Sequence, residues 1–406
     1  MSKVICFLFL LIPSVFFSQL MRIGIFSRDK INRVNVSYSE SSYSIFADST
    51  YIGEINKNDF AEIQQVENDK LKLYVGVLEI GVFSSVKLVQ SFSAGNMTLT
   101  IKNSDIKPRK YTGDFYFSTG KNGIKIINQV HLEDYIAAVV ESEGGVGHHL
   151  EYYKAQAVMS RTYALKSKNR HSKDGFDLCD QVHCQAYHYK WRFSNSILTA
   201  VKSTQNEVLI DQKLDLVEGF FHANCGGQTS EPDLIWNESI PYLKTFKDTF
   251  CIFTKQAKWE KRIEKTKWVD FFQKKYFVSP QDTVFKSQQF NFKQDSRLAF
   301  FVDPRYGIPL RDIRDAFQLK STLFSCSDDG EYVKLSGKGY GHGVGLCQEG
   351  AMKMAKSNFS YQQILKYYFE GTKIINLKSI IDVSINDLKT TEPVTFETYF
   401  TNSNGE

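Results

Sequence analysis

The sequence predicts an α+β fold, in which a strand-rich N-terminal part precedes a core with a few helices packed on mixed sheets. The chain has 406 residues, of which 42% are hydrophobic, so it can bury a sizeable core. From Met21 to about Thr112, short apolar runs alternate with polar residues, which is typical of strands. Beyond His131 the apolar residues recur with a helical period.

The first predicted strands are short segments separated by Asn, Asp, Gly and Ser, the residue types that favour turns. They read RIGIF (22–26), RVNVSY (33–38), KLKLYVGVLEI (70–80), SVKLVQSF (85–92) and MTLTI (97–101). Residues 113–130 add two strands joined by a turn at Gly120 to Gly123.

Two helices follow these strands. The segment LEDYIAAVVES (132–142) has a helical apolar stripe and is stopped by Gly144 and Gly145, and a second helix begins at Leu150 with LEYYKAQAVMSRTYALKSK. The remaining predictions are strands within 206–227 and 331–346, a helix at 361–369 and a polar tail at 390–406.

Composition excludes some classes of protein. The net charge is +5 and charged residues make up 23%, without the dense Lys/Arg stripe of a nucleic-acid binder. Aromatic residues make up 14%, which suits strand packing and platforms for sugar rings.

The first residues indicate export. Lys3 precedes a short apolar run from Val4 to Phe17 and then the small Ser18, so residues 1–18 are predicted to be a secretory signal peptide. The alternative is an uncleaved membrane anchor. No later segment has the apolar length of a membrane span, so we expect a secreted or periplasmic protein without a span after signal removal.

Glu143 is the residue where chemistry is expected. It extends the apolar stripe of Tyr135, Ile136, Val139 and Val140 and lies in the last helical turn, where burial and the helix dipole favour a neutral carboxyl. A neutral carboxylic acid near pH 7 is what glycosidic cleavage needs from a general acid. Glu141, two residues away, points elsewhere and is expected to face solvent. The alternative for Glu143 is a solvated side chain at a helix end.

The sequence resembles the SpoIID/LytB family, the stage II sporulation protein D and amidase-enhancer group. The blocks that carry the resemblance keep their order over about residues 105–373. They are YTGDFYFS, INQVHLEDYIAAVVESE, LEYYKAQAVMSRTYAL, HCQAY, NCGGQTSEPDLIW, PYLKTFKD, GKGYGHGVGLCQEGAMKMA and YQQILKYYFEGT. The resemblance implies a catalytic domain at 105–373. Together with the predicted signal peptide at 1–18, this leaves a strand-rich part at 19–104, expected to join the core, and an extension at 374–406.

The resemblance implies a lytic transglycosylase of peptidoglycan that acts on glycan strands stripped of their peptides. The family's catalytic glutamate falls on Glu143. One carboxylate suffices, because the 6-hydroxyl of N-acetylmuramic acid replaces water as the nucleophile, unlike the two-carboxylate schemes of hydrolases. Where the family typically has Met-Pro after the glutamate, this chain has Gly144-Gly145, so the shape of the adjoining loop is in doubt.

Substrate contacts are predicted from the other blocks. In GKGYGHGVGL, glycines at alternate positions 339–345 leave one face of a predicted strand bare, while His342 on the other face is expected to line the glycan site. A structural histidine is the alternative. Weaker candidates for hydrogen bonds to sugar groups are Arg161, Tyr163, Gln185 and Gln348, and Arg161 could equally be a buried member of a structural ion pair.

A cluster of metal-ligand types lies at His171, Cys179, His183 and Cys184. Two thiolates and two imidazoles can hold a structural zinc, and some family members resemble zinc proteins here, although the spacing is not that of a standard zinc finger. A Cys179–Cys184 disulfide is the alternative in an oxidising compartment. No cofactor is expected to be required for catalysis, since four protein ligands leave a metal no open position.

The resemblance also implies a disulfide. The family often has serine where this chain has Cys225 in NCGG and Cys347 in GLCQ, so a Cys225–Cys347 bond is expected, with Cys251 and Cys326 as the remaining pair. Among four cysteines three pairings exist, and the sequence does not choose among them.

Two classes of function remain. The first is the transglycosylase that acts on peptidoglycan glycan strands, and the second is a non-catalytic module that binds glycan and enhances a cell-wall amidase as its partner. A metal-dependent peptidase is disfavoured because the chain has no HExxH motif. A role in sporulation does not follow from the family name.

Overall fold

A computed structural model of the protein describes residues 19–38, 42–55, 59–67, 69–91, 96–188, 195–236 and 238–379. The predicted signal peptide and the predicted polar tail lie outside these residues. Strands and helices are both abundant, which confirms the α+β class. The chain divides into two compact units: unit 1 comprises 1–135 and 169–188, and unit 2 comprises 136–168 and 189–406.

Unit 1 contains a seven-stranded sheet of order β13-β1-β12-β11-β8-β3-β4. Its pairs are antiparallel, except that β13 lies parallel to β1. Side chains alternate between core and surface, so that Tyr43, Ile45 and Ala47 of β3 are buried. The strands are β1 (Leu20–Ile25), β3 (Tyr43–Ala47), β4 (Thr50–Ile55), β8 (Ser85–Gln90), β11 (Asp114–Gly120), β12 (Gly123–His131) and β13 (Leu178–Cys179).

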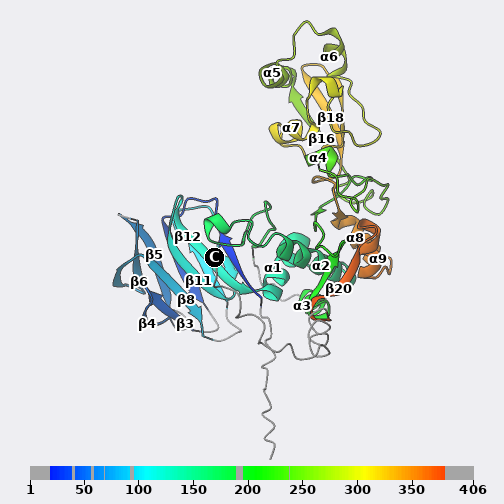
Figure 1. The fold of residues 1–406 in the computed structure, drawn as a ribbon. Helices are drawn as coiled ribbons and strands as arrows, with labels where there is room; N and C mark the ends of the chain where they lie inside the picture. The colour runs from blue at the N-terminus through cyan, green and yellow to red at the C-terminus, as the bar shows by residue number, and fades with distance from the viewer. Residues whose placement is uncertain are drawn as a thin grey trace, which may run out of the picture. The chain divides into compact units, whose positions relative to one another are not determined.

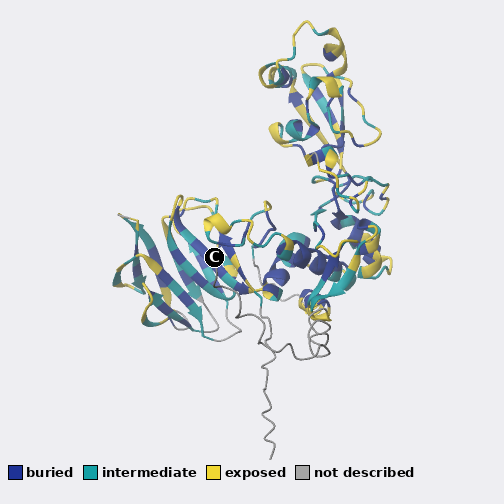
Figure 2. Ribbon diagram, in the orientation of Figure 1, coloured by how far each residue is buried: buried dark blue, intermediate teal, exposed yellow. Residues whose placement is uncertain are grey.

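A six-stranded antiparallel sheet of order β10-β9-β2-β5-β6-β7 completes unit 1. Its strand β6 packs against β8 and β11 of the first sheet, so the two sheets form layers around a shared core. Figure 2 shows buried residues alternating with more exposed ones along these strands. The strands are β2 (Arg33–Tyr38), β5 (Phe60–Val66), β6 (Lys70–Val75), β7 (Leu78–Phe83), β9 (Met97–Ile101) and β10 (Arg109–Tyr111).

The compact units do not follow the domain boundary drawn from the sequence at residues 104 and 105. Strands β10, β11 and β12 pair within the two N-terminal sheets, so they belong to unit 1. The segment 169–188 also returns to unit 1, where β13 extends the edge of the first sheet beside β1. The reason is hydrogen bonding between strands that lie far apart in sequence.

Unit 2 is built around α2 (Leu150–Lys166), which the sequence predicted. The helix is buried on nearly all sides, because α3 (Asn195–Ser203), α8 (Gln348–Lys356), α9 (Tyr361–Tyr368) and strand β14 (Glu207–Ile210) pack against it. Strand β14 pairs with β20 (Lys373–Asn376). Figure 1 shows α1 (Leu132–Gly144), the other predicted helix, directly after β12.

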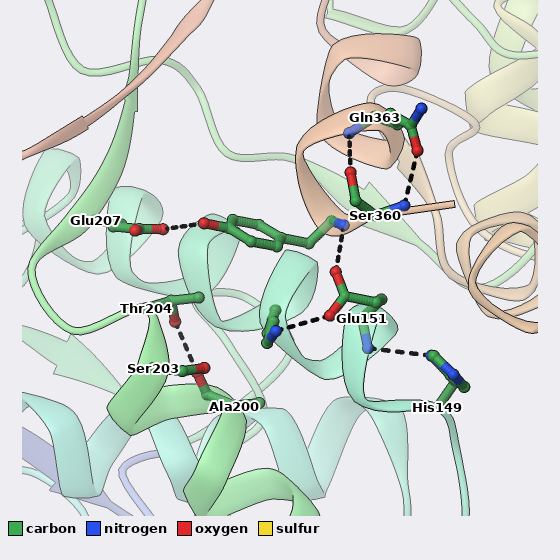
Figure 3. Close-up of polar contacts among 10 residues, drawn as sticks. His149, Glu151, Ala200, Ser203, Thr204, Glu207, Ser360 and Gln363 are labelled. Atoms are coloured by element: carbon green, nitrogen blue, oxygen red, sulfur yellow. Dashed lines mark hydrogen bonds and ion pairs between the residues drawn. The ribbon is translucent and has the colours of Figure 1, made fainter. Parts of the chain in front are cut away.

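Polar contacts fix α9 against α2 (Figure 3). Ser360 and Gln363 form a reciprocal capping box at the N-terminus of α9. The backbone N–H of Tyr361 donates to Glu151 Oε2 over 2.8 Å, and its hydroxyl donates to Glu207 Oε2 over 2.9 Å. Tyr361 therefore connects the start of α2 with β14.

The segment from 258 to 338 of unit 2 has a core of its own. Its antiparallel sheet, of order β16-β18-β17, carries aromatic residues against three helices, and Phe272 stacks on Phe301 with ring centroids 5.3 Å apart. The elements are β16 (Lys258–Glu264), α5 (Lys265–Tyr276), α6 (Thr283–Gln288), the short turn Pro304–Tyr306, α7 (Leu310–Ala316), β17 (Phe324–Asp329) and β18 (Tyr332–Lys338). Only β18 was foreseen from the sequence.

Three short elements complete the described chain. Helix α4 (Asp233–Trp236) precedes this segment, and strand β15 (Phe221–His222) pairs parallel with β19 (Leu346–Cys347). None of the described helices is both long enough and apolar enough to cross a membrane.

Candidate functional site

Glu143 lies where α1 ends. The helix runs to Gly144, and Gly145 follows with a left-handed φ of 69° while its N–H donates to the carbonyl of Glu141 over 3.0 Å. Tyr135, Ile136, Val139 and Val140 are all buried, so the predicted apolar stripe faces the core. The Glu143 side chain is half-buried, and the last turn of α1 holds no basic residue to compensate its charge.

The position of Glu141 differs from the prediction. Glu141 is half-buried, and its Oε1 atom is inaccessible to water. The pKa of the Tyr153 hydroxyl is raised mainly by burial, and the nearby charge of Glu141 raises it further. The loop that follows α1 folds back over this side of the helix, because Tyr153 Oη donates to the carbonyl of Gly145 over 3.1 Å. Glu141 is therefore partly buried rather than exposed.

Tyr152 places a hydroxyl beside Glu143. Burial, and then the charge of Glu143, raise the pKa of the Tyr152 hydroxyl, so it keeps its proton and remains a donor. The Gln348 side chain lies beside this buried oxygen and lowers its pKa in part, as a hydrogen-bond donor does. A Cβ atom on Gly144 would lie 2.8 Å from it, so glycine at 144 is what allows the hydroxyl to approach the helix end.

Gln348 joins this group from α8. Its side-chain amide donates to the carbonyl of Glu143 over 3.5 Å and to Gln156 Oε1 over 3.4 Å. Gln348 is 6% exposed, and Gln156 is fully buried in α2. The C-terminus of α1 and the N-terminus of α8 therefore meet here, although Glu143 and Gln348 are about two hundred residues apart in sequence. The middle of α2 joins them through Gln156. Gln348 was predicted near the site, whereas Tyr152 was not singled out.

His148 is a second residue that sequence reasoning missed. It lies between α1 and α2, with its ring edge-on to Tyr152 and Tyr153 at centroid distances of 5.5 and 6.1 Å. Burial and then Lys356 lower its pKa, which favours the neutral imidazole. The signal was available in the sequence, because two histidines follow directly after the loop that begins at Gly144.

His342 lies in an aromatic group with Phe220, His222 and Trp236, whose ring centroids are 6.2, 5.6 and 5.1 Å from its own. Its Nδ1 accepts a hydrogen bond from the N–H of Val344 over 3.1 Å. Burial, and then Arg314, lower the pKa of His342 to about 4, so the ring is neutral at physiological pH. His342 as a whole residue is half-buried.

The sequence predicted that the glycines around His342 form the bare face of a strand, and the structure does not show this. Gly339, Gly341, Gly343 and Gly345 all have left-handed φ values, between 74° and 110°, so the run is irregular backbone. A Cβ atom on Gly339 would lie 2.6 Å from the carbonyl oxygen of Asn224, and Gly345 meets the backbone of Phe220 as closely. Gly339, Gly341 and Gly345 are needed because they pack against the 220–226 segment, and Gly343 because it packs against Arg297.

Three other predicted sugar contacts are buried. Arg161 is inaccessible and donates to the backbone carbonyl of Glu207 over 3.0 Å. Tyr163 is 5% exposed, beside Gly219. Gln185 belongs to unit 1, where its Oε1 accepts a hydrogen bond from Tyr135 over 3.3 Å. Among the predicted sugar-binding residues, Gln348 contacts the backbone of Glu143.

The predicted metal-ligand cluster is assembled in unit 1. The ligand atoms of His171, Cys179, His183 and Cys184 lie within 4.8 Å of one another. His183 Nδ1 is 3.8 Å from Cys179 Sγ and 3.7 Å from Cys184 Sγ, and both thiols are free. His171 Nδ1 contacts Asp174 at 3.0 Å, which leaves its buried Nε2 without a partner. A carboxylate behind a histidine is typical of zinc ligation, so these residues fit the metal.

The predicted cysteine pairs need correction. Cys225 and Cys347 are neighbours, because the Cys225 N–H donates to Cys347 Sγ over 3.3 Å, but both are free thiols. Cys251 lies beside them, with its sulfur 3.3 Å from that of Cys225. Cys326 lies instead in the aromatic core under β17 and donates to the carbonyl of Gln289. The pairing of Cys251 with Cys326 is therefore wrong.

Comparison with known proteins identifies the class. Residues 120–210 match the family model described as stage II sporulation protein, SpoIID. The chain therefore carries a SpoIID-family domain, as the sequence motifs predicted. The matched region includes Glu143, Tyr152 and the His171 cluster.

Individual relatives agree with this class. An uncharacterized protein of Brachyspira hyodysenteriae is 25% identical over 87% of this chain and 95% of its own length. Stage II sporulation protein D of Bacillus subtilis is 29% identical over 61% of this chain and 75% of its own. The amidase enhancer of Bacillus subtilis is 27% identical over 59% of this chain and 40% of its own.

Proposed function

We propose that the chain is a lytic transglycosylase that cleaves the bond between N-acetylmuramic acid and N-acetylglucosamine in peptide-stripped peptidoglycan strands. The observation that carries this proposal is the half-buried Glu143 at the end of α1, within the SpoIID-matched region. Its neighbours are the protonated Tyr152 hydroxyl and the Gln348 amide, which are neutral hydrogen-bonding groups. Half-burial at a helix C-terminus favours the protonated acid that the reaction needs.

The reaction needs a single carboxyl group. Glu143 gives its proton to the glycosidic oxygen as the bond to the muramic C1 breaks, and N-acetylglucosamine leaves with a new hydroxyl. The muramic 6-hydroxyl then bonds to C1, and the Glu143 carboxylate takes the hydroxyl proton. A 1,6-anhydro ring results, and the acid is restored without water. Tyr152 can donate to the carboxylate while it is charged, because its own proton is retained.

His342 supports sugar binding rather than proton transfer. Its ring is neutral at physiological pH and lies beside Trp236, which is partly exposed. An aromatic surface with a neutral imidazole suits the apolar face and the hydroxyl groups of a sugar ring. We therefore assign His342 and Trp236 to glycan contact and expect their removal to raise KM more than it lowers kcat.

The decisive experiment is mass spectrometry of amidase-stripped glycan strands incubated with the protein. We expect products that end in 1,6-anhydromuramic acid from the wild type and none from Glu143→Gln. Glu141→Gln is the matched control, since it changes the same functional group two residues away and should keep activity. Equal product from the wild type and Glu143→Gln would refute the assigned role.

A second candidate function is a non-catalytic module that binds glycan and enhances a cell-wall amidase. The observation in its favour is the similarity to a protein named amidase enhancer. Strands that co-sediment with the protein but stay uncleaved, together with faster hydrolysis by an added amidase, would select this function.

The His171 cluster would hold a structural zinc. The two thiolates of Cys179 and Cys184 and the two imidazoles of His171 and His183 fill a tetrahedral shell, so the metal has no open position for substrate. The ion would fix the 169–188 segment at the edge of unit 1. Metal analysis of the full chain should find less zinc in Cys184→Ser, and an unchanged zinc content would contradict the site.

The place of action follows from the substrate. We infer that the protein works outside the cytoplasm at the cell wall, with peptidoglycan strands as its partner and an amidase acting before it. The predicted export signal at 1–18 and the names of the relatives support this. Detection of the protein in the cytoplasm alone would contradict it.

A further inference from the structure

Unit 2 contains a second cluster of metal-ligand side chains, separate from the Glu143 group. Cys225, Asp248, Cys251 and Cys347 come from three distant parts of the chain, and their ligand atoms lie within 4.8 Å of one another. All four residues are completely buried. The convergence of three thiols on a buried carboxyl group demands a physical reason, because a carboxylate is costly to bury without a strong partner.

The distances fit a tetrahedral ion. Zinc bound to thiolates at about 2.3 Å separates the sulfurs by roughly 3.8 Å. Cys225 Sγ lies 3.3 Å from Cys251 Sγ and 3.3 Å from Asp248 Oδ2. Small outward movements of these side chains would make room for an ion at the centre.

Backbone donors already point at the sulfurs. Cys347 Sγ accepts the N–H of Cys225 over 3.3 Å and the N–H of Gly350 over 3.4 Å, which makes it the N-cap of α8. Donors of this kind stabilise a thiolate more than a neutral thiol. These two N–H groups would therefore support the Cys347 sulfur as a thiolate when a metal ion is bound.

A buried cation lies against the same cluster. Arg297 is 6% exposed, and its guanidinium donates to the carbonyl of Cys225 over 2.7 Å and to that of Gln228 over 2.9 Å. It forms no ion pair with any carboxylate of the described residues. Three thiolates and a carboxylate exceed the charge of one divalent ion, and Arg297 would offset part of the remainder.

The outer contacts hold the carboxylate in place. Tyr368 Oη donates to Asp248 Oδ2 over 2.9 Å, and the N–H of Phe250 donates to Asp248 Oδ1 over 2.9 Å. A Cβ atom on Gly350 would lie 2.8 Å from Asp248 Oδ2 and 3.3 Å from Cys347 Sγ, so only glycine fits there. Oriented ligands with hydrogen-bonded supports are typical of metal sites.

We propose that Cys225, Asp248, Cys251 and Cys347 form a second, structural zinc site. It joins the 225–251 segment to the start of α8, whose next residue, Gln348, contacts Glu143. The inference does not rest on the proposed function, since a glycan-binding module without catalytic activity could contain the same structural zinc site. A disulfide is the competing outcome, but it would engage two sulfurs and leave a third thiol, Asp248 and Arg297 without a shared partner.

Metal content of the full chain, purified without chelator, tests the site. We expect Cys347→Ser and Cys251→Ser each to lose about one equivalent of zinc relative to wild type. Cys326→Ser is the matched control, because Cys326 is equally buried but lies in the other core. Cys179→Ser, in the His171 cluster, should remove a different equivalent, and the double variant with Cys347→Ser should lose both.

Two further measurements remain decisive where the variants of the second cluster fail to fold. Cobalt-loaded protein should show thiolate-to-metal charge-transfer absorption, and Cys179→Ser should retain most of it, since three of the five proposed cysteine ligands lie in the second site. Peptide mapping without reduction should find Cys225, Cys251 and Cys347 as free thiols. A disulfide between any two of them, or zinc loss in none of the folded cysteine variants, would overturn the proposal.

Discussion

Gly144 and Gly145 are adjacent residues with different physical requirements. Gly144 is limited by space, because a Cβ atom there meets the Tyr152 hydroxyl. Gly145 has open space around its Cα but a left-handed backbone. A side chain therefore costs steric displacement at the first position and backbone strain at the second.

We predict separable effects for two substitutions. Gly145→Ala should lower the free energy of unfolding by about 1 kcal/mol through its left-handed φ, with kcat nearly unchanged. Gly144→Ala should lower kcat, because the buried Tyr152 ring has little room to retreat. Urea unfolding and product formation measured on both variants check this, and equal kcat values for the two would contradict the assignment of Tyr152 to the site.

His342 gives a pH dependence of stability. Its pKa is about 4 in the folded protein and near 6.5 when unfolded, so the unfolded chain binds the proton more readily. Its contribution is therefore fully present above pH 6.5 and is lost as the pH falls through about 4. The wild type should lose more stability than His342→Gln between pH 7 and pH 4 in urea titrations, and parallel losses would contradict it.

At the scale of elements, α9 depends on its first turn. The side chain of Ser360 accepts the N–H of Gln363 over 3.3 Å, and the Gln363 side chain accepts the N–H of Ser360 over 2.9 Å. The next residue, Tyr361, makes the contacts to Glu151 and Glu207 (Figure 3). The cap therefore aligns the helix and the tyrosine that anchors it.

Ser360→Ala should lower the free energy of unfolding by about 1 kcal/mol, because one capping hydrogen bond is lost. Ser360→Asp should keep most of the stability, since its carboxylate can accept the same N–H. Chemical denaturation of both variants provides the measurement. Equal stability of Ser360→Ala and the wild type would show that the contacts of Tyr361 hold α9 without the cap.

The helices α1 and α2 could be predicted because their apolar residues keep a helical period and Gly144 follows the first. The glycine run around His342 was misread, since alternation of glycine resembles a strand pattern while the reason for it lies in the backbone of residues 220–226. Tyr152 looked like an ordinary aromatic residue of a helix, and only the fold brings it to Glu143. The sequence pattern thus identified the catalytic candidate and Gln348, but not Tyr152.

At the scale of the whole molecule, the two units are interleaved along the chain. Helix α1 begins in unit 1 and ends in unit 2, and the chain returns to unit 1 at 169–188. The compact units differ from the linear division expected from the sequence, because sequence composition carries no sign of this return. The His171 cluster was nevertheless predicted, since its four ligands lie within one short segment, whereas the ligands of the second cluster are spread from 225 to 347.

The parallel pairing of β13 with β1 sets an order of events during synthesis. The backbone N–H groups of Asp177 and Asp180 donate to the carbonyls of Arg22 and Gly24. The N–H of Phe26 in turn donates to Asp180 Oδ2 over 2.8 Å. An emerging chain can pair β1 with β12 early, but this edge of β1 stays open until both α1 and α2 have been made. A nascent chain stalled before residue 169 therefore exposes a sheet edge, which makes that interval the one in which a holding chaperone would be most needed.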